Sequence, residues 1–439
     1  MAAASTIYAL ATSPGKGGVA VLRISGPHAG QALHFLGLDH LPAARLATLA
    51  TLRHGAQILD KALVLHFPAP HSFTGEDVVE LHLHGGTAVV QSVLTALAHC
   101  TGLRLAEAGE FTRRAFLNDK MDLAQAEGLA DLIDAQTSAQ HRQALRQLGG
   151  DASLIVTSLR EQILTPLALL EAYIDFPDEE IPEDVLLETT QRVSNLVAEI
   201  QLLINDGGIG EKIREGMEIV ILGPPNAGKS SLLNCLSKRE AAIVSNEPGT
   251  TRDTIEVHLE IGGYEVTLVD TAGLRETSGA IEAEGIKRAK NRAADSEFNL
   301  ILLDCATAAE QYSELADLLT EKNLLIVTKS DQNITPKLPQ NYLPVSVHSG
   351  EGIDNLIEAI KTRIVGIMES APSPLITRAR HREALRDALN ALSHWNLANP
   401  LELACEDLRV AAACLGKITG KIWVDDVLDL VFSRFCIGK

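Results

Sequence analysis

Short apolar runs alternate with glycine-rich turns in the first part of the chain, up to about residue 118. These apolar runs predict strands at Ile7–Ala11, Val19–Ile24, Ala62–Phe67 and Val78–His84. A predicted helix, Thr87–Ala98, follows the last strand. A mixture of this kind predicts an α+β domain.

From about residue 119 the pattern becomes helical. Met121–Leu148 contains no proline, and Pro166, Pro177 and Pro182 are expected to interrupt the interval that follows. A later set of apolar residues recurs at the spacing of one helix face. This set is Val193, Leu196, Val197, Ile200 and Leu203.

After Gly207 and Gly208 strands alternate with helices up to about Glu369, which predicts a largely parallel sheet. The predicted strands are Glu218–Leu222, Ile255–Ile261, Glu265–Asp270, Asn299–Asp304, Leu324–Thr328 and Leu343–Val347. Ala371–Pro374 is expected to be a linker, because helical periodicity resumes after it. The predicted domains are 1–118, a helical domain made of 119–210 and 372–439, and an inserted α/β domain, 211–371.

Composition narrows the functional classes. The 439 residues carry a formal net charge of −19, which argues against a protein that grips nucleic acid unaided. An arginine cluster at 378, 380, 382 and 386 is interpreted as a solvated helix face rather than a nucleic-acid contact. The six cysteines form no C-x-x-C pair, and His82 and His84 lack a third ligand, so no zinc site or disulfide framework is expected. With no signal peptide and no membrane-length apolar run, a cytoplasmic protein is expected.

The strongest chemical signal is Gly223–Ser230, which fits G-x-x-x-x-G-K-S between a predicted strand and a predicted helix. Its two glycines, Gly223 and Gly228, let backbone N–H groups curl around phosphates, and the helix N-terminus adds its positive end. Lys229 is expected to contact the β- and γ-phosphates, and the Ser230 hydroxyl to bind Mg²⁺.

Two further segments fit the same nucleotide site. Asp270-Thr-Ala-Gly273 ends a predicted strand, where Asp270 can hold Mg²⁺ through water and the Gly273 N–H can touch the γ-phosphate. A threonine hydroxyl in the preceding loop, at Thr250 or Thr251, can complete the Mg²⁺ shell.

Thr328-Lys-Ser-Asp331 resembles the N-K-x-D box that selects guanine. The Asp331 carboxylate can accept hydrogen bonds from N1 and N2 of guanine, and Lys329 is expected to lie along the base. Thr328 replaces the usual asparagine and so removes an amide that helps to tie the loop together. Ser346-Val-His348 replaces the usual Ser-Ala-Lys. Both departures predict guanine preference with weakened affinity.

The sequence motifs alone do not decide which side chain orients the attacking water. Leu274 occupies the position of the Ras-type glutamine and cannot polarise water. Glu282 or Glu284, further along the same segment, could do so. On spacing alone, a solvated acidic loop is the favoured interpretation of these glutamates.

The nucleotide motifs, the stretch Gly109–Glu127 (G-E-F-T-R-R-A-F-L-N-D-K-M-D-L-A-Q-A-E) and the C-terminal Phe435–Lys439 (F-C-I-G-K) together resemble the MnmE (TrmE) family over essentially the whole chain. The resemblance implies a K⁺-activated GTPase whose G domains dimerise. It implies Asn226, Ser245, Glu247 and Thr250 as K⁺ ligands, Ser230 and Thr251 as Mg²⁺ ligands, and Glu282, Lys229 and Thr251 as catalytic residues. The GTP-binding set is Asn226, Ala227, Gly228, Lys229, Ser230, Ser231, Ser245, Asn246, Glu247, Pro248, Gly249, Thr250, Thr251, Asp270, Thr271, Ala272, Gly273, Thr328, Lys329, Asp331 and Ser346.

The resemblance also implies a folate site at Arg23, Glu80, Lys120 and Lys439 that takes 5-formyl- or methylene-tetrahydrofolate. Cys436 could be a reactive thiol or a structural residue. The implied partners are a second copy and the FAD-containing protein MnmG, in a heterotetramer or larger complex. Its implied substrate is carbon-5 of the tRNA wobble uridine, with tRNA held mostly by the partner and no membrane involved.

Two alternatives carry weight. A ribosome-assembly switch GTPase without tRNA modification activity would have the same nucleotide site. The other is a stand-alone folate-dependent transferase with a regulatory G domain. The Gly109–Glu127 stretch and the C-terminal box argue against the first alternative, because generic GTPases lack both.

Overall fold

The computed structural model describes residues 5–176, 182–239, 255–270, 292–294, 296–315, 319–320, 322–332, 334–370, 376–422, 425–433 and 435–438. The chain divides into two compact units. Unit 1 comprises Met1–Ala130, Gln147–Thr189 and His394–Lys439, and unit 2 comprises Asp131–Arg146 and Thr190–Ser393.

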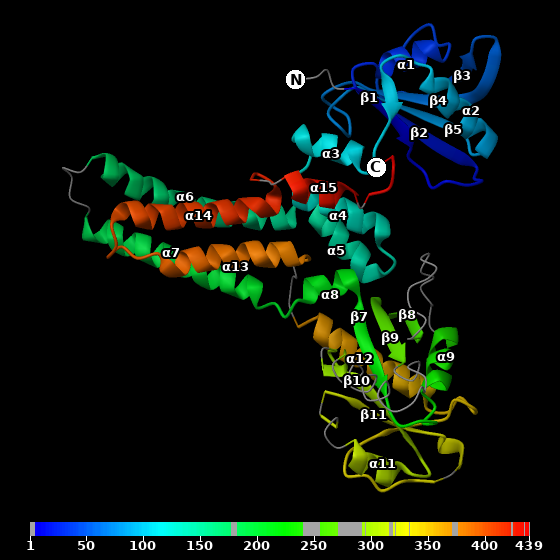
Figure 1. The fold of residues 1–439 in the computed structure, drawn as a ribbon, viewed down its shortest axis with the longest axis vertical. Helices are drawn as coiled ribbons and strands as arrows, with labels where there is room; N and C mark the ends of the chain where they lie inside the picture. The colour runs from blue at the N-terminus through cyan, green and yellow to red at the C-terminus, as the bar shows by residue number, and fades with distance from the viewer. Residues whose placement is uncertain are drawn as a thin grey trace, which may run out of the picture. The chain divides into compact units, whose positions relative to one another are not determined.

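A six-stranded sheet in the order β3-β4-β5-β2-β1-β6 forms the N-terminal part of unit 1 (Figure 1). Its strands are β1 (Thr6–Leu10), β2 (Val19–Ser25), β3 (Thr48–His54), β4 (Gln57–Phe67), β5 (Val78–His84) and β6 (Leu103–Leu105). All neighbours are antiparallel except β1 and β6. Helices α1 (Ala29–Phe35) and α2 (Thr87–Ala98) share its apolar core, which includes Leu22, Leu33, Leu81 and Leu97.

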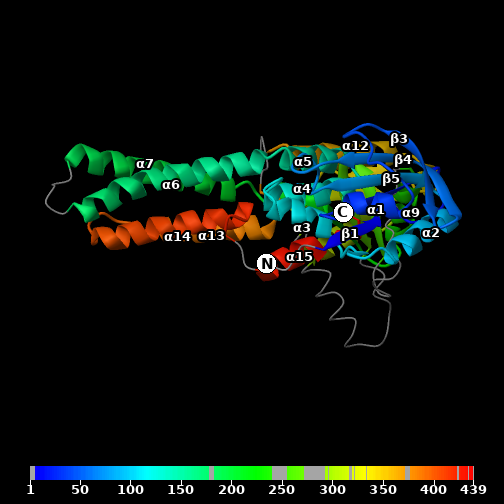
Figure 2. The same ribbon diagram turned by 90° about the horizontal axis from the view of Figure 1, so that it is seen from above.

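Helices make up the rest of unit 1. They are α3 (Glu110–Leu117), the start of α4 (Leu123–Asp134), α6 (Asp151–Asp175), α14 (Leu401–Thr419) and α15 (Asp425–Ser433), with α7 (Glu183–Ile204) beginning in unit 1. Helices α6 and α14 run side by side (Figures 1 and 2). Of the described helices, α6 alone is long and apolar enough to cross a membrane. One face of α6 packs along α14, where the Arg160 Nε donates to the Ala412 carbonyl at 3.2 Å, and Leu159, Ile163 and Leu170 are buried.

A second six-stranded sheet, in the order β12-β11-β10-β7-β9-β8, lies in unit 2. Its strands are β7 (Met217–Leu222), β8 (Ile255–Ile261), β9 (Tyr264–Asp270), β10 (Asn299–Asp304), β11 (Leu324–Thr328) and β12 (Leu343–Val345). All neighbours are parallel except β8 and β9. The predicted, largely parallel sheet is therefore confirmed.

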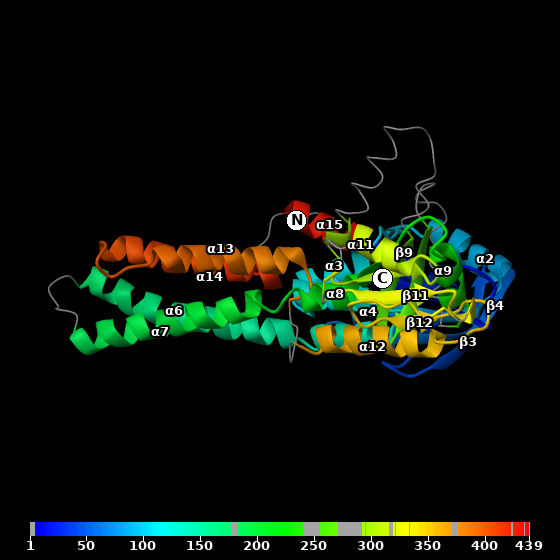
Figure 3. The ribbon, with the colours of Figure 1, turned by 90° about the horizontal axis from the view of Figure 1, so that it is seen from below.

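Apolar residues on both faces of this sheet are covered, which is typical of parallel sheets. Helices α9 (Lys229–Arg239) and α12 (Ile353–Met368) pack on one face, and α12 is seen beside β12 in Figure 3. Helix α11 (Ala308–Glu314) packs on the other face. The other helices described in this unit are the end of α4, most of α5 (Ser138–Leu148), most of α7, α8 (Ile209–Glu215), the turn η3 (Ser330–Gln332) and most of α13 (Ala379–His394).

Several expectations about elements need correction. Pro166 lies inside α6 and does not interrupt it, so that helix lacks one backbone donor without ending there. Strands β3 and β6 and helix α1 were not predicted, and β4 begins at Gln57 rather than Ala62. Strand β3 is missed because its exposed positions blur the alternation of apolar and polar residues.

The arginine cluster is also corrected by the structure. Arg378 pairs with Asp131 at 2.6 Å, and Arg382 pairs with Asp206 at 2.8 Å, in each case with a largely buried guanidinium. Only Arg386 of the four is exposed. The cluster is therefore not a solvated helix face, and two of its charges are neutralised within unit 2.

Candidate nucleotide-binding site

The phosphate-binding loop joins β7 to α9, as its motif predicts. Gly223 has φ of 152°, and a Cβ there would lie 2.5 Å from the Leu302 carbonyl oxygen. No larger residue fits this close approach of two backbones. Asn226 adopts a left-handed conformation with φ of 62°, which asparagine tolerates better than most residues.

Gly228, the second glycine of the motif, is required by its backbone conformation and not by lack of space. Its φ is 90°, which residues with a side chain rarely adopt, whereas a Cβ would meet Thr328 at 3.9 Å, an ordinary contact. The Gly228 carbonyl accepts from the Leu232 N–H at 2.8 Å, where the loop enters α9. The structure therefore gives Gly228 the task of turning the chain into the helix, and its contact with a phosphate stays a prediction.

The Lys229 ammonium is buried against this loop. Its Nζ donates to the carbonyl oxygens of Gly223 at 2.7 Å and Pro224 at 2.9 Å. Burial lowers the pKa of Lys229, and the nearby Asp270 carboxylate partly offsets the effect. A phosphate is a stronger acceptor than these carbonyls, so this cation is held where an anionic ligand can recruit it.

Ser230 and Asp270, the two residues predicted to lie near Mg²⁺, are brought together. The Ser230 Oγ donates to Asp270 Oδ2 at 2.6 Å, and Asp270 is fully buried. Parallel pairing of β7 with β9 sets Ile221 opposite Asp270, which places both groups at the carboxyl edge of the sheet. A hydroxyl and a carboxylate are oxygen donors that suit a hard divalent cation.

The predicted guanine-selecting residues converge at the ends of β11 and β12. The Ser346 Oγ donates to Asp331 Oδ1 at 2.6 Å, and this hydrogen bond lowers the pKa of Asp331. The carboxylate therefore stays ionised and keeps acceptor capacity for a base. Lys329 has a left-handed φ of 59°, and its ammonium pairs with Asp304. Burial acts to raise the pKa of Asp304, but hydrogen bonds from Lys329 and the Ala306 N–H bring it below its usual value.

Thr328 corrects part of the argument for weakened affinity. Its side chain is nearly inaccessible, and Oγ1 lies 2.8 Å from the Ala227 carbonyl oxygen and 3.1 Å from that of Leu303. The hydroxyl thus ties the guanine-selecting loop to the phosphate-binding loop. That tie is the one the sequence argument expected to be lost with the asparagine amide.

Several predicted residues lie outside the described part of the chain. These are Ser245–Thr251, Thr271, Ala272, Gly273, Leu274, Glu282, Glu284 and Lys439.

Two of the predicted folate residues are partners in unit 1. Register in the β2–β5 pair sets Arg23 directly opposite Glu80, and the Arg23 Nε donates to Glu80 Oε1 at 2.9 Å. The guanidinium also lies over the rings of Phe73 at 5.2 Å and Phe111 at 5.8 Å. These two phenylalanines were not predicted as site residues, although Phe111 lies within the Gly109–Glu127 stretch.

Lys120 contacts the loop that carries one of these rings, since its Nζ donates to the Pro70 carbonyl at 3.0 Å. The C-terminal segment also reaches the N-terminal sheet. Ile437 forms a bridge with Ala108, and a Cβ on Gly438 would lie 2.0 Å from the Leu10 carbonyl oxygen. Cys436 is exposed beside this bridge.

A cavity of about 790 Å³ lies between α3 and α15 in unit 1. Its lining includes Glu107, Glu110, Arg113, Arg114, Asp429 and Phe432. Neither Arg23 nor Glu80 lines it, so it is distinct from the predicted folate residues. No group of three or more metal-ligating His, Cys, Asp or Glu side chains occurs among the residues that the structure describes.

A phosphate-binding loop, a buried Ser–Asp pair and a guanine-selecting Asp–Ser pair at the edges of one mainly parallel sheet define the class as P-loop GTPases. Comparison with known proteins gives the family. The model described as "MnmE helical domain" matches residues 123–436, and the one described as "GTP-binding protein TrmE N-terminus" matches residues 6–120. The chain belongs to the MnmE family.

Relatives agree along their whole length. The protein named "tRNA modification GTPase MnmE" in Parvibaculum lavamentivorans is 49% identical to this chain, over 99% of this chain and 100% of the relative. The protein of that name in Paramagnetospirillum magneticum is 47% identical, over 99% of each chain. In Rhodospirillum rubrum the identity is 48%, also over 99% of each chain. The inserted domain and the parts around it thus occur together in the relatives, which disfavours a generic switch GTPase.

Proposed function

We propose that this protein hydrolyses GTP to GDP and phosphate in the course of tRNA modification. The observation that carries the proposal is the convergence of Lys229, the Ser230–Asp270 pair and the Asp331–Ser346 pair in one domain. A cation, a divalent-ion site and a guanine acceptor are the three recognition elements that GTP requires.

In this proposal Lys229 turns from the loop carbonyls to the β- and γ-phosphates. Ser230 and Thr251 would supply hydroxyl ligands to Mg²⁺, and Asp270 would hold the ion through water. Mg²⁺ supplies neutralisation of the phosphate charge that develops during transfer. Asp331 accepts from the guanine edge, and Glu282 orients the attacking water.

The proposal includes K⁺ activation through G-domain dimerisation. Asn226 supplies a side-chain oxygen, and Ser245, Glu247 and Thr250 supply further oxygens, which suit a hard cation. The left-handed backbone at Asn226 supports this role, because strained positions concentrate at ligand-binding sites. When bound there, K⁺ would supply the positive charge that an arginine finger supplies in other GTPases, an effect worth roughly 10³–10⁵ in rate.

We also propose that the chain acts in the cytoplasm as a homodimer with the FAD-containing partner MnmG on carbon-5 of the tRNA wobble uridine. The one-carbon unit comes from a tetrahydrofolate derivative bound near Arg23, Glu80, Lys120 and Lys439. The net charge of −19 supports a division of labour in which the partner carries most of the tRNA surface.

GTP turnover by the full chain in equimolar KCl and NaCl, with Asn226→Ala alongside, tests the proposal. High turnover in K⁺ that falls in Na⁺ and collapses in the variant is expected. Equal rates in the two salts would refute the proposed K⁺ site and favour a plain switch GTPase. Intact GTP binding without turnover in either salt would refute the proposed hydrolase activity.

A further inference from the structure

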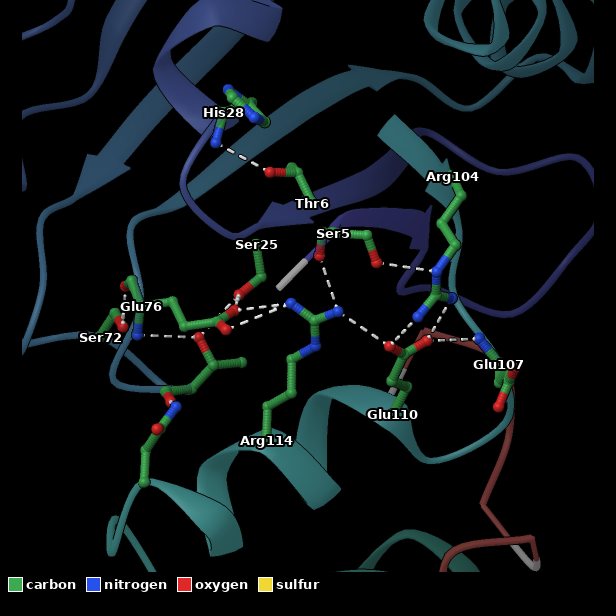
Figure 4. A network of polar contacts seen from close by, with 12 residues as sticks. Ser5, Thr6, Ser25, His28, Ser72, Glu76, Arg104, Glu107, Glu110 and Arg114 are labelled. Carbon is green, nitrogen blue, oxygen red and sulfur yellow. Dashed lines mark hydrogen bonds and ion pairs between the residues drawn. The ribbon is translucent and has the colours of Figure 1, made fainter. Parts of the chain in front are cut away.

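The Gly109–Glu127 stretch forms α3, the turn after it and the first part of α4. Three of its side chains hydrogen-bond to one loop of the N-terminal sheet. The loop, residues 68–77, connects β4 to β5 and carries Phe73, which covers Arg23. The three gripping side chains are Arg114, Asn118 and Lys120. Figure 4 shows the polar network around the first of them.

Arg114 is the centre of this network. Its guanidinium is mostly buried and donates to both carboxylate oxygens of Glu76, at 3.0 and 3.2 Å, and to the Ser5 carbonyl at 2.8 Å. A further hydrogen bond, of 2.9 Å, runs to Glu110 one turn earlier in α3. Both contacts to Glu76 come from Nη1, whereas Nη2 donates to Ser5 and Glu110, so the two ends of the guanidinium are held by different partners and its orientation is fixed.

Glu110 is held in turn from the other side. It accepts two hydrogen bonds from Arg104 and one of 3.0 Å from the Glu107 N–H. Burial acts to raise the pKa of Glu110, but these donors and Arg114 bring it below its usual value, so the group stays ionised. The ionised Glu110 carboxylate therefore helps to hold Arg114 in the rotamer in which it contacts Glu76.

Glu76 lies in the 68–77 loop and links Arg114 to Ser25 of β2. Its Oε2 accepts from Ser25 Oγ at 2.7 Å, and that hydroxyl also lies 2.7 Å from Thr74 Oγ1. Asn118 Nδ2 donates to the Thr74 carbonyl at 2.7 Å. Phe73 directly precedes Thr74, and Lys120 donates to the Pro70 carbonyl on its other side, so the backbone that carries the ring over Arg23 is tethered on both sides.

We infer that Arg114 is a positioning residue for the folate site: through Glu76 it holds the 68–77 loop so that Phe73 stacks on Arg23 and aligns it with Glu80. The inference rests on the proposed folate site. It gives the Gly109–Glu127 stretch a physical task, which is to preorganise the surface around Arg23 and Glu80.

Titration of the full chain with 5-formyl-tetrahydrofolate in a calorimeter tests the inference. Arg114→Ala should weaken binding about tenfold or more, since it removes hydrogen bonds between charged groups. Arg113→Ala is the matched control. Arg113 is the neighbour on α3, and it makes a solvent-exposed pair with Asp429 at 3.0 Å. Its removal should change affinity by less than about twofold.

A coupling measurement separates positioning from general damage. In a Phe73→Ala background, Arg114→Ala should cause little further loss of folate affinity, because Arg114 is inferred to act on Arg23 through the Phe73 ring. Arg114→Lys should be intermediate, and GTP turnover should match the unmodified chain in every variant.

Three outcomes are informative in different ways. Wild-type chain that does not bind the folate would overturn the proposed folate site itself. Folate binding that is unaffected by Arg114→Ala would overturn this inference and leave the site intact. Equal losses in the Arg113 and Arg114 variants would indicate general damage to α3, and additive losses with Phe73→Ala would show that Arg114 acts independently of Phe73. Either result would also overturn the inference.

Discussion

Replacement of Thr328 by valine removes the hydroxyl that links the two nucleotide-binding loops while keeping the side-chain shape. Thr328 is 2% exposed, and its Oγ1 lies 2.8 Å from the Ala227 carbonyl oxygen. Water cannot take the place of the hydroxyl at such a site. The carbonyl of a residue inside the phosphate-binding loop is then left without this donor.

A buried acceptor that loses its donor costs about 1–3 kcal/mol. If the whole cost falls on the loop conformation that binds nucleotide, GDP affinity falls about 5–150-fold, because 1.4 kcal/mol is a factor of ten. If the loops relax so that Ala227 finds another donor, the loss approaches the lower figure.

Isothermal titration of GDP into the full chain at fixed Mg²⁺ and K⁺ measures the effect. Ser330→Ala is the matched control. Ser330 is two residues away, and its buried Oγ has no hydrogen-bond partner among the described residues. Wild-type affinity in the Thr328 variant would refute the reasoning, and so would an equal loss in both variants.

Two further outcomes follow from unit 1. Glu110→Gln should lower the thermal midpoint of unfolding near pH 7. Burial acts to raise the pKa of Glu110, but its hydrogen-bond donors bring the pKa below the usual 4.5. The ionised carboxylate therefore stabilises the fold fully above pH 4.5, and this stabilisation is lost as the pH falls through the lower pKa of the folded state. Scanning fluorimetry across pH should therefore show the two midpoints converging below pH 4.5, and a constant gap would contradict this. Gly438→Ala should detach the C-terminal segment, since φ is 101° and the new Cβ would lie 2.0 Å from the Leu10 carbonyl. Hydrogen exchange at Ile437 reports it, with Gly366→Ala, where a Cβ meets open space, as the control that should not respond.

Features that depend on contiguous residues were predictable. The phosphate-binding loop and the strands Val78–His84, Asn299–Asp304 and Leu324–Thr328 need only local pattern, and the structure confirms these strands residue for residue. The missed features depend on partners distant in sequence. The Thr328 hydroxyl finds an acceptor 101 residues away, and Arg23 finds Glu80 57 residues away through strand register.

Pro166 shows a different limit. Local propensity predicts a break, yet the proline is buried within a 25-residue helix. Packing along α14 outweighs the loss of one backbone hydrogen bond there, as tertiary contacts commonly override propensity. The burial of Arg378 and Arg382 was unpredictable for the same reason, because Asp131 and Asp206 approach from other elements.

The two stretches most specific to the family, Gly109–Glu127 and Phe435–Lys439, meet in the structure. A Cβ on Gly109, at the start of α3, would lie 2.2 Å from the Phe432 carbonyl oxygen, and Ala108 bridges Ile437. Phe116 and Phe435 share one apolar cluster with Phe432.

Each stretch is therefore constrained by the other as well as by any ligand. Gly109 and Gly438 are required by backbone contacts, and the phenylalanines by packing, whereas Arg114, Asn118 and Lys120 face the 68–77 loop. Chemistry at the C-terminal end consequently has to be sought in the residues that packing leaves free. Of those described, Cys436 is the exposed nucleophile between two anchored neighbours, Phe435 and Ile437. A Cys436→Ser variant that keeps folate binding but loses tRNA modification would show that Cys436 has a chemical role. A variant that keeps both activities would show that the C-terminal segment has a structural role only.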